Sequence, residues 1–388
     1  MAYRLAVVSE SMPHYYHSGV GTVIGECLTA ISDRGWQSSL VGPRFEGCNL
    51  HPGYWLPSIG LCRGYRSVAI CLPSVERNLE RIFGQVDVVH LHSVSPLTIK
   101  SLEIISRMKD PPKSILHLHT QAEEYARKLF GVFSQPIVDF VANRIENAAG
   151  RADLVMVPSY HFSEVIQARY NLTKSPTVWA SPVDISAADV SKARLLARTL
   201  ELPEDSKVVY FIGRIEPEKN IEFLLRVFAL LEGEKRIHLV LAGGGQIPKL
   251  RKKVPQRLQN RIHFLGHVPR EVTLGLCKFF QIGITASTTE TQGLGLLEQM
   301  AMGMPVMAPI GTCFDLPIID SGGGDIFPLE PRLWAQNIVC AIDDYDWCKS
   351  MGRMGSEYIE NNYSPVYQHR KLQRIYERLA MELLSTAS

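Results

Sequence analysis

The sequence of 388 residues lacks an excess of charge of either sign. It contains 41 Lys and Arg against 39 Asp and Glu, for a formal net charge of +2. Such a balance provides no extended basic surface of the kind that wraps nucleic acid. We therefore expect no nucleic-acid partner, and any contact with a charged ligand or a membrane must depend on a local group of side chains.

The sequence also lacks a secretory leader and a long apolar run. Residues 1–9 contain a short apolar strand pattern, Leu5 to Val8, without the basic region and cleavage site of a signal peptide. No stretch approaches the ~18 uncharged apolar residues that span a bilayer. We expect a cytoplasmic protein, and peripheral contact with the cytoplasmic face of a membrane stays open.

Cysteine is present without a pattern. Eight cysteines are scattered along the chain, and no two form a CxxC pair. Without such spacing they are predicted to be reduced side chains, most of them packing residues, and not a disulfide or metal framework. They are Cys27, Cys48, Cys62, Cys71, Cys277, Cys313, Cys340 and Cys348.

Short apolar runs rich in Val, Ile and Leu alternate with longer helical patterns over the whole chain. This alternation is typical of parallel strands joined by crossover helices. Strands are expected at residues 4–8, 38–41, 86–92, 114–119, 154–158, 207–212, 238–242, 262–264, 282–285 and 306–308. The pattern predicts an α/β protein of two Rossmann-like, doubly wound parallel sheets that face across a cleft.

A domain boundary is expected after Ser181-Pro182-Val183-Asp184, where a helical stretch follows and strand periodicity begins again at Val208. The length of the chain suits two or three domains of ~150 residues. The predicted parts are residues 1–185, residues 186–365, and a C-terminal helix at 366–388 for which a return to the first domain stays open.

Two glutamates, Glu290 and Glu298, stand out in the second half. Glu290 ends the loop after an expected strand, and Glu298 lies within the helical pattern that follows. Gly293 and Gly295 between them let a backbone approach a ligand closely, and the helix N-terminus offers N–H groups to an anion. Two glutamates at this spacing are by themselves more often solvated helix residues than ligand-binding ones. The sequence around them therefore decides between the two interpretations.

Two cations follow another expected strand, in Gly213-Arg214-Ile215-Glu216-Pro217-Glu218-Lys219. The carboxyl edge of a parallel sheet is where phosphates bind in such folds. Without further context Arg214 and Lys219 could equally be surface cations.

Histidines recur in pairs, His90 with His92 and His117 with His119, each at the end of an apolar strand. Alternate residues of a strand point the same way, so each pair could chelate a metal. No third ligand stands at a suitable spacing, and we predict ordinary polar strand-end residues and no metal.

In the first half, Gly19-Val20-Gly21 follows the first strand and precedes a helical pattern. A Gly-x-Gly alone is a weak marker. Because the full GxGxxG and its ribose-binding acid are missing, the pattern disfavours a dehydrogenase.

The string from Thr289 to Ala308 resembles the signature of retaining GT-B glycosyltransferases of glycosyltransferase family 4, also called group 1. The resemblance covers Arg4 to about Tyr363. It implies that Glu290 binds hydroxyls of the donor sugar and that Glu298 binds the ribose of the nucleotide. It also implies a diphosphate clamp of Arg214 and Lys219, which stabilises the leaving group. The further donor-binding positions that it implies are Gly19, Gly21, Gly213, Gly243, His267, Val268, Gln292, Gly293 and Leu294, with His119 beside the reacting sugar.

The resemblance further implies transfer of a hexose from a nucleotide diphosphate sugar with retention of configuration. UDP-glucose is the commonest donor in the family, and no metal and no other cofactor are needed. Residues 1–185 would bind the acceptor, and residues 186–365 the donor. Catalysis would then rest on electrostatics and positioning, without a protein nucleophile.

Three features resemble the branch of the family that glycosylates diacylglycerol. They are Gly19-Val20-Gly21-Thr22, Leu56-Pro57-Ser58-Ile59 with Gly64-Tyr65-Arg66 and Leu72-Pro73 downstream, and Gln292 in place of a common Phe. Separately, the apolar segment from Arg127 to Arg144 has basic flanks and could seat in a bilayer interface, and an ordinary core helix interrupted by Pro136 stays open as the alternative. A soluble sugar, a sugar phosphate or a small metabolite stays open as acceptor. A nucleotide-sugar 2-epimerase and a non-catalytic sugar-nucleotide binder on the same fold are the alternatives of another class.

Overall fold

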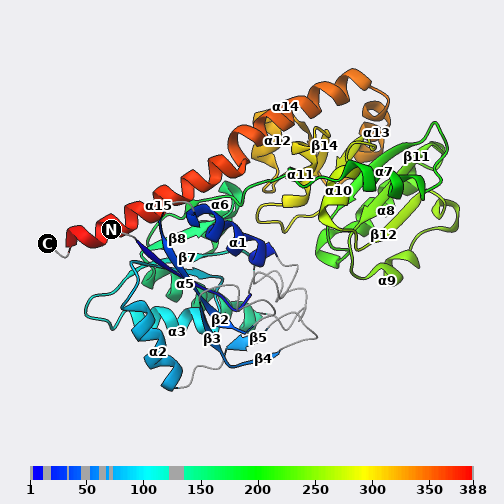
Figure 1. The fold of residues 1–388 in the computed structure, drawn as a ribbon. Helices are drawn as coiled ribbons and strands as arrows, with labels where there is room; N and C mark the ends of the chain where they lie inside the picture. Colours follow the sequence, from blue (N-terminus) through cyan, green and yellow to red (C-terminus); the bar gives the residue numbers. More distant parts are fainter. Residues whose placement is uncertain are drawn as a thin grey trace. The chain divides into compact units, whose positions relative to one another are not determined.

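The computed structural model describes residues 3–11, 19–32, 35–44, 53–60, 67–69, 73–121 and 135–386. The chain divides into two compact units (Figure 1). Unit 1 comprises Met1–Pro182 and Val366–Ser388, and unit 2 comprises Val183–Pro365. On sequence grounds the limits are expected at residues 185 and 365.

Unit 1 is built on a parallel sheet with the order β3-β2-β1-β6-β7-β8-β9. Its strands are β1 (Arg4–Val8), β2 (Gln37–Pro43), β3 (Gly53–Leu56), β6 (Val88–His92), β7 (Lys113–His117), β8 (Leu154–Val157) and β9 (Thr177–Val178). The residues from Leu5 to Val8 in β1 are fully buried. Burial on both faces explains why this strand is apolar throughout and does not alternate. A short antiparallel pair, β4 (Ser58–Gly60) with β5 (Ser67–Ala69), forms a separate two-stranded sheet.

Helices cover both faces of this sheet. They are α1 (Gly19–Ser32), α2 (Pro73–Phe83), α3 (Pro96–Ile105), α5 (Gln135–Arg151), α6 (Tyr160–Arg169) and α15 (Pro365–Thr386). On one face, Cys27 of α1 and Tyr376 of α15 join Leu5 and Val7 in a single core cluster. The opposite face packs against α2, α3 and α5. The last helix is therefore part of the unit 1 core, and Figure 1 shows it running from α14 to the C-terminus.

Unit 2 holds the second parallel sheet, with the order β12-β11-β10-β13-β14-β15. Its strands are β10 (Lys207–Ile212), β11 (Ile237–Ala242), β12 (Ile262–Gly266), β13 (Ile282–Ile284), β14 (Val306–Pro309) and β15 (Gly324–Phe327). Its α-helices are α7 (Val190–Arg198), α8 (Ile221–Leu230), α9 (Ile247–Arg251), α10 (Arg270–Leu276), α11 (Leu294–Ala301), α12 (Asp315–Ser321), α13 (Pro331–Ile342) and α14 (Tyr345–Tyr363). The strand order reverses between β10 and β13, and ligands bind at such switch points, outside the carboxyl ends of the strands.

The predicted class, two doubly wound parallel sheets, is confirmed. In the two parallel sheets the prediction misses β3, β9 and β15, which lie at sheet edges and are short or carry few apolar residues. It also misses the short pair β4 and β5. β7 ends at His117, two residues before the predicted end, so His119 lies beyond the strand.

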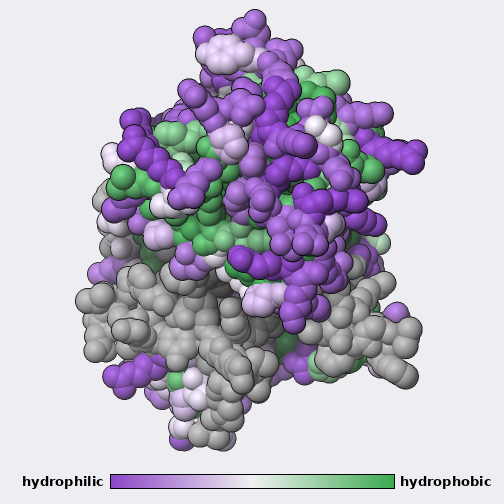
Figure 2. Space-filling model, turned by 90° about the vertical axis from the view of Figure 1, so that its right-hand side faces the viewer, coloured by the Kyte–Doolittle hydropathy of each residue, from purple (hydrophilic) through white to green (hydrophobic). Residues whose placement is uncertain are grey.

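The described helices include none that is both long and apolar enough to cross a membrane. On the face drawn in Figure 2, hydrophilic residues surround smaller groups of hydrophobic ones. Part of the predicted apolar segment, residues 127–134, lies outside the described residues. Within the described part Val138 is buried, and Phe140 is 57% exposed beneath the guanidinium of Arg144.

Candidate functional site

The loops after β10, β11 and β12 are joined backbone to backbone at the carboxyl edge of the unit 2 sheet. Gly213 N donates to Ala242 O at 3.0 Å, and Gly243 N donates to Gly266 O at 2.8 Å. Gly243 has a φ of 150°, and a Cβ there would stand 1.8 Å from Gly213 O. Only glycine allows this approach, which explains the glycine at the end of β11.

Lys219 ends a 3₁₀ turn, η3 (Pro217–Lys219), between β10 and α8. Its Nζ contacts Oε1 of Glu290, in the loop after β13. The two side chains are only 16% and 20% exposed. Asn220 fixes the turn, because it adopts a left-handed φ of 52° and its Nδ2 donates to Ala286 O at 3.2 Å. The loops of the two switch-point strands thus meet through a largely buried ion pair.

Arg214 lies in the same loop as Lys219 and has a different partner. Its Nη2 donates to Oε1 of Glu218 at 2.8 Å, and its side chain is 51% exposed. Each of the two predicted phosphate-binding cations is therefore paired with a carboxylate.

Gly293 forms the N-cap of α11, with a left-handed φ of 75°. A Cβ at this position would stand 2.0 Å from a ring carbon of Phe314, so the site requires glycine on steric and conformational grounds. Leu294 begins the helix, whose first N–H groups have no acceptor within the helix. The adjoining Gln292 is 7% exposed. This turn provides donors for an anion beside the Lys219–Glu290 pair.

Glu298 lies within α11 and is held by Arg270, the first residue of α10. Arg270 Nε donates to Glu298 Oε1 at 2.8 Å, and its Nη2 donates to Asp184 O at 2.6 Å. Burial raises the pKa of the Glu298 carboxyl, and the charge of Arg270 opposes this shift. Arg270 is the residue that sequence analysis misses. The only local signal is its place directly after Pro269, and nothing there indicates a partner 28 residues away.

His267 and Val268 follow β12 as predicted. His267 is exposed, whereas Val268 is partly buried and packs against a core cluster of unit 2. A Cβ added at Gly244 would lie 3.9 Å from the Cβ of His267, so this loop adjoins the one after β11.

The remaining predicted positions lie in unit 1. Gly19 and Gly21 fall in the first turn of α1, so the helix begins earlier than the predicted glycine loop allows. His119 is 8% exposed, and its Nε2 lies 2.9 Å from Nδ1 of His92. Burial lowers the pKa of His119 to about 3, which keeps its imidazole neutral.

The structure thus brings Lys219 to Glu290 and provides Arg270 as a partner for Glu298. Gly293 and Leu294 come from the loop that carries Glu290. A buried thiol, Cys313, lies close enough that Glu290 raises its pKa while Lys219 lowers it, although burial has the largest effect. These features make the switch point of unit 2 a candidate site for an anionic ligand.

Solved structures with the same architecture define the class of protein as a GT-B glycosyltransferase fold. Sucrose-phosphate synthase from Thermosynechococcus elongatus superimposes over 100% of both chains, with a TM-score of 0.76 and 17% identity. HepE from Anabaena in complex with UDP gives a TM-score of 0.74 and 17% identity, over 97% of this chain and 100% of HepE. At such identities the likeness concerns the fold alone.

The family follows from the sequence. Residues 17–187 match the family described as Glycosyltransferase Family 4, and residues 206–344 match Glycosyl transferases group 1. The chain belongs to the family 4, group 1 glycosyltransferases, as its motifs predict.

Two similar relatives carry the name alpha-monoglucosyldiacylglycerol synthase. The one from Streptococcus pneumoniae is 28% identical over 234 residues, which is 58% of this chain and 52% of the relative. The one from Acholeplasma laidlawii is 26% identical over 296 residues, 73% of this chain and 72% of the relative. The match thus spans about half the length of the first relative and almost three quarters of the second.

Proposed function

We propose that the chain is a retaining glycosyltransferase that transfers glucose from UDP-glucose to an acceptor hydroxyl and forms an α-glycoside. The observation that carries this proposal is the contact of Lys219 with Glu290 at the switch point of unit 2. It places a cation for phosphate and a carboxylate for sugar hydroxyls side by side, and these are the two groups that a diphosphate sugar presents.

In this proposal the diphosphate of the bound donor replaces Glu218 as the partner of Arg214 and Glu290 as the partner of Lys219. Arg214 and Lys219 stabilise the negative charge that develops as the bond from the anomeric carbon to the phosphate oxygen breaks. A phosphate oxygen of the donor accepts the proton of the acceptor hydroxyl, whose oxygen bonds to the anomeric carbon on the same face. The cations come from the protein, so the transfer needs no added metal.

Glu290 binds hydroxyls of the transferred sugar in this arrangement, and the N–H groups at Gly293 and Leu294 bind the diphosphate. Glu298 accepts from the ribose hydroxyls, and Arg270 orients it for that task. His267 and Val268 contact the base. The roles of His119, Gly19 and Gly21 stay predictions from the family resemblance.

We further propose that the acceptor is a membrane lipid such as diacylglycerol. The names of the two relatives and the lipid-branch features of the sequence support this choice. Binding to the membrane surface would then be peripheral, and exposed Phe140 with Arg144 above it is the kind of pair that seats at a lipid interface.

The decisive test is product analysis with labelled UDP-glucose. Diacylglycerol vesicles, soluble sugars and sugar phosphates are offered in parallel, with and without added Mg²⁺, and the anomeric configuration is read by NMR. We expect an α-glucosyl lipid and no stimulation by Mg²⁺. A β-linked product would contradict retention of configuration. A product formed only on the soluble acceptors would contradict the proposal that the acceptor is a lipid. Donor consumption without any new glycoside, or release of a free epimer, contradicts the transferase itself.

Membrane binding is tested separately by flotation with anionic vesicles. We expect the protein to float at low salt and to be released at high salt, because Coulombic attraction is screened. Failure to float under both conditions would favour a soluble acceptor.

A further inference from the structure

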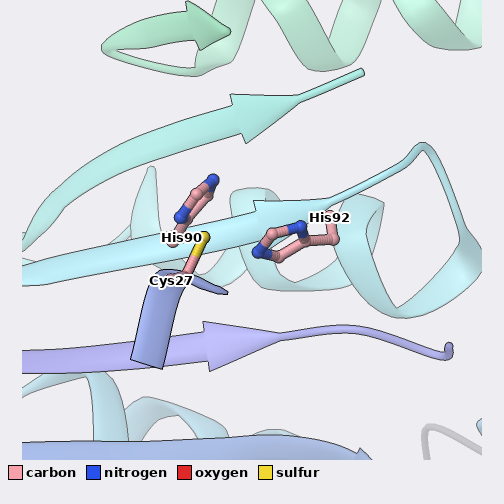
Figure 3. Close-up of side chains that lie close together, drawn as sticks. All are labelled: Cys27, His90 and His92. Carbon is pink, nitrogen blue, oxygen red and sulfur yellow. The ribbon is translucent and has the colours of Figure 1, made fainter. Parts of the chain in front are cut away.

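Unit 1 contains a buried group of metal-ligating side chains that the proposed transfer does not use. Cys27 projects from α1, and His90 and His92 project from β6, toward one another (Figure 3). The exposure of all three side chains is 1% or less. They occupy the sheet face that α1 and α15 cover, together with His117 of β7.

The hydrogen bonds of the two β6 histidines are arranged alike. Nδ1 of His90 lies 2.7 Å from the hydroxyl of Tyr376, and Nδ1 of His92 lies 2.9 Å from Nε2 of His119. For Nε2 of His90 and Nε2 of His92, the part of the chain that the structure describes supplies no hydrogen-bond partner. A buried polar atom left unpaired loses its hydrogen bonds to water without compensation, so two such atoms in one place require an explanation.

The thiol of Cys27 and the rings of His90 and His92 fit the requirements of a metal site. Cys27 Sγ and one ring nitrogen each of His90 and His92 lie within 4.8 Å of one another. A histidine that binds a metal normally donates its other ring N–H to an acceptor, which fixes the tautomer. Tyr376 can accept from Nδ1–H of His90, and His119 can accept from Nδ1–H of His92. With the proton on Nδ1, the lone pair on Nε2 of each ring is free to bind a metal.

We propose that Cys27, His90 and His92 bind one divalent transition-metal ion, with Zn²⁺ as the ion that a thiolate and two imidazoles suit best. The ligand atoms need to draw together, and the thiol releases its proton to solvent as the sulfur–metal bond forms. His117 is the candidate fourth ligand. Both of its ring nitrogens lack a hydrogen-bond partner among the described residues, and its ring centroid lies 5.4 Å from that of His90 and 5.5 Å from that of His92.

A second set, His92 with His117 and His119, also lies within 4.8 Å. It is the weaker candidate because His119 Nε2 is already engaged by His92. The set with Cys27 keeps that bond and also connects α1 to the sheet. The ion would therefore be structural, since it would tie α1 to β6, the strand whose His92 contacts His119.

The test uses the full-length protein and cobalt as a spectroscopic probe. The protein is stripped with a chelator and titrated with Co²⁺, in the wild type, in Cys27→Ser, and in Cys277→Ser as a control that changes a buried thiol of unit 2. We expect one Co²⁺ per chain and a near-ultraviolet sulfur-to-cobalt charge-transfer band, lost in Cys27→Ser and retained in Cys277→Ser. Zn²⁺ should displace the cobalt and raise the Tm of the wild type.

Two results overturn the proposal. One is the absence of stoichiometric metal in the wild type at micromolar free Co²⁺ or Zn²⁺, which needs no variant to fold. The other is binding without the charge-transfer band, which would assign the ion to the second set, or with a band that Cys27→Ser leaves unchanged, which would assign the ion to another thiol. If Cys27→Ser does not fold, His90→Gln replaces it, with an expected loss of at least tenfold in Zn²⁺ affinity; unchanged affinity contradicts the site.

Discussion

Arg270 and Glu298 form a two-nitrogen contact, in which Nε and Nη2 of the guanidinium lie 2.8 and 2.7 Å from the same carboxylate oxygen. Glu298 is 10% exposed on its side chain, whereas Arg270 is 48% exposed. The second oxygen of Glu298 does not take part in this contact. Arg270 thus holds one oxygen of a buried carboxylate.

This relationship predicts a pH effect. Burial raises the pKa of Glu298 and Arg270 lowers it, so Arg270→Gln should raise this pKa further. Because the ionised carboxylate is the better acceptor for ribose hydroxyls, the KM for UDP-glucose should increase as the pH falls through the pKa of Glu298. In Arg270→Gln this increase should begin at a higher pH, with kcat less affected.

The measurement is the KM for UDP-glucose between about pH 5 and pH 8, the range in which stability is usually greatest. Arg353→Gln is the control, because it removes an exposed ion pair with Glu357 on α14. Superimposable pH profiles for wild type and Arg270→Gln would contradict the role of Arg270.

Replacement of Lys219 by Ala should reduce kcat by about 10²–10³-fold, the effect typical of losing one donor that stabilises developing charge. The fold should persist, because the pair with Glu290 belongs to a loop and not to the sheet. Lys253→Ala is a matched control that breaks another Lys–Glu pair of unit 2, with Glu222. Equal turnover in the two variants, with unchanged circular dichroism, would remove Lys219 from the diphosphate clamp.

Gly293→Ala should both destabilise unit 2 and abolish donor binding. The new Cβ meets Phe314 at 2.0 Å, and the residue would also have to keep a φ of 75°. Gly311→Ala separates the two causes, because Gly311 has a φ of 76° and no heavy atom within 4 Å of the added Cβ. Strain alone should cost about 1–2 kcal/mol there.

The measurements are thermal unfolding and isothermal titration with UDP. Gly311→Ala should lower the Tm modestly and bind UDP normally. An equal loss of Tm in both variants would show that the contact with Phe314 is relieved at little cost.

Leu372→Ala in α15 should destabilise unit 1 by about 2–5 kcal/mol, because Leu372 is fully buried against the sheet and its removal leaves a cavity. Met381→Ala on the same helix, at a side chain that is 57% exposed, should change stability little. Urea denaturation followed by tryptophan fluorescence reports the effect, since Trp179 Nε1 donates to Gln368 O at 2.9 Å in α15. Equal midpoints for the two variants would show that α15 contributes little to the stability of unit 1.

Much of the fold is predictable because its signals are local. Parallel strands buried on both faces are apolar throughout, as in Val208 to Phe211, and β10 and β11 are predicted to within one residue. Edge strands such as β9 and β15 escape prediction, because they are short or only partly buried and carry little periodicity. Gly213 and Gly293 could be predicted as special positions from the sequence, because each adopts a positive φ that favours glycine.

The sequence alone determines the residue types of the candidate site, its glycine turns and the family of the chain. The tertiary structure decides the pairing: Lys219 with Glu290 across 71 residues, Arg270 with Glu298, and Cys27 with two histidines of β6. The reason is topological. Strands that are distant in the sequence have their carboxyl ends at the same edge of a parallel sheet. Which of their loops meet at that edge depends on the order of the strands in the sheet, and no local sequence pattern encodes this order.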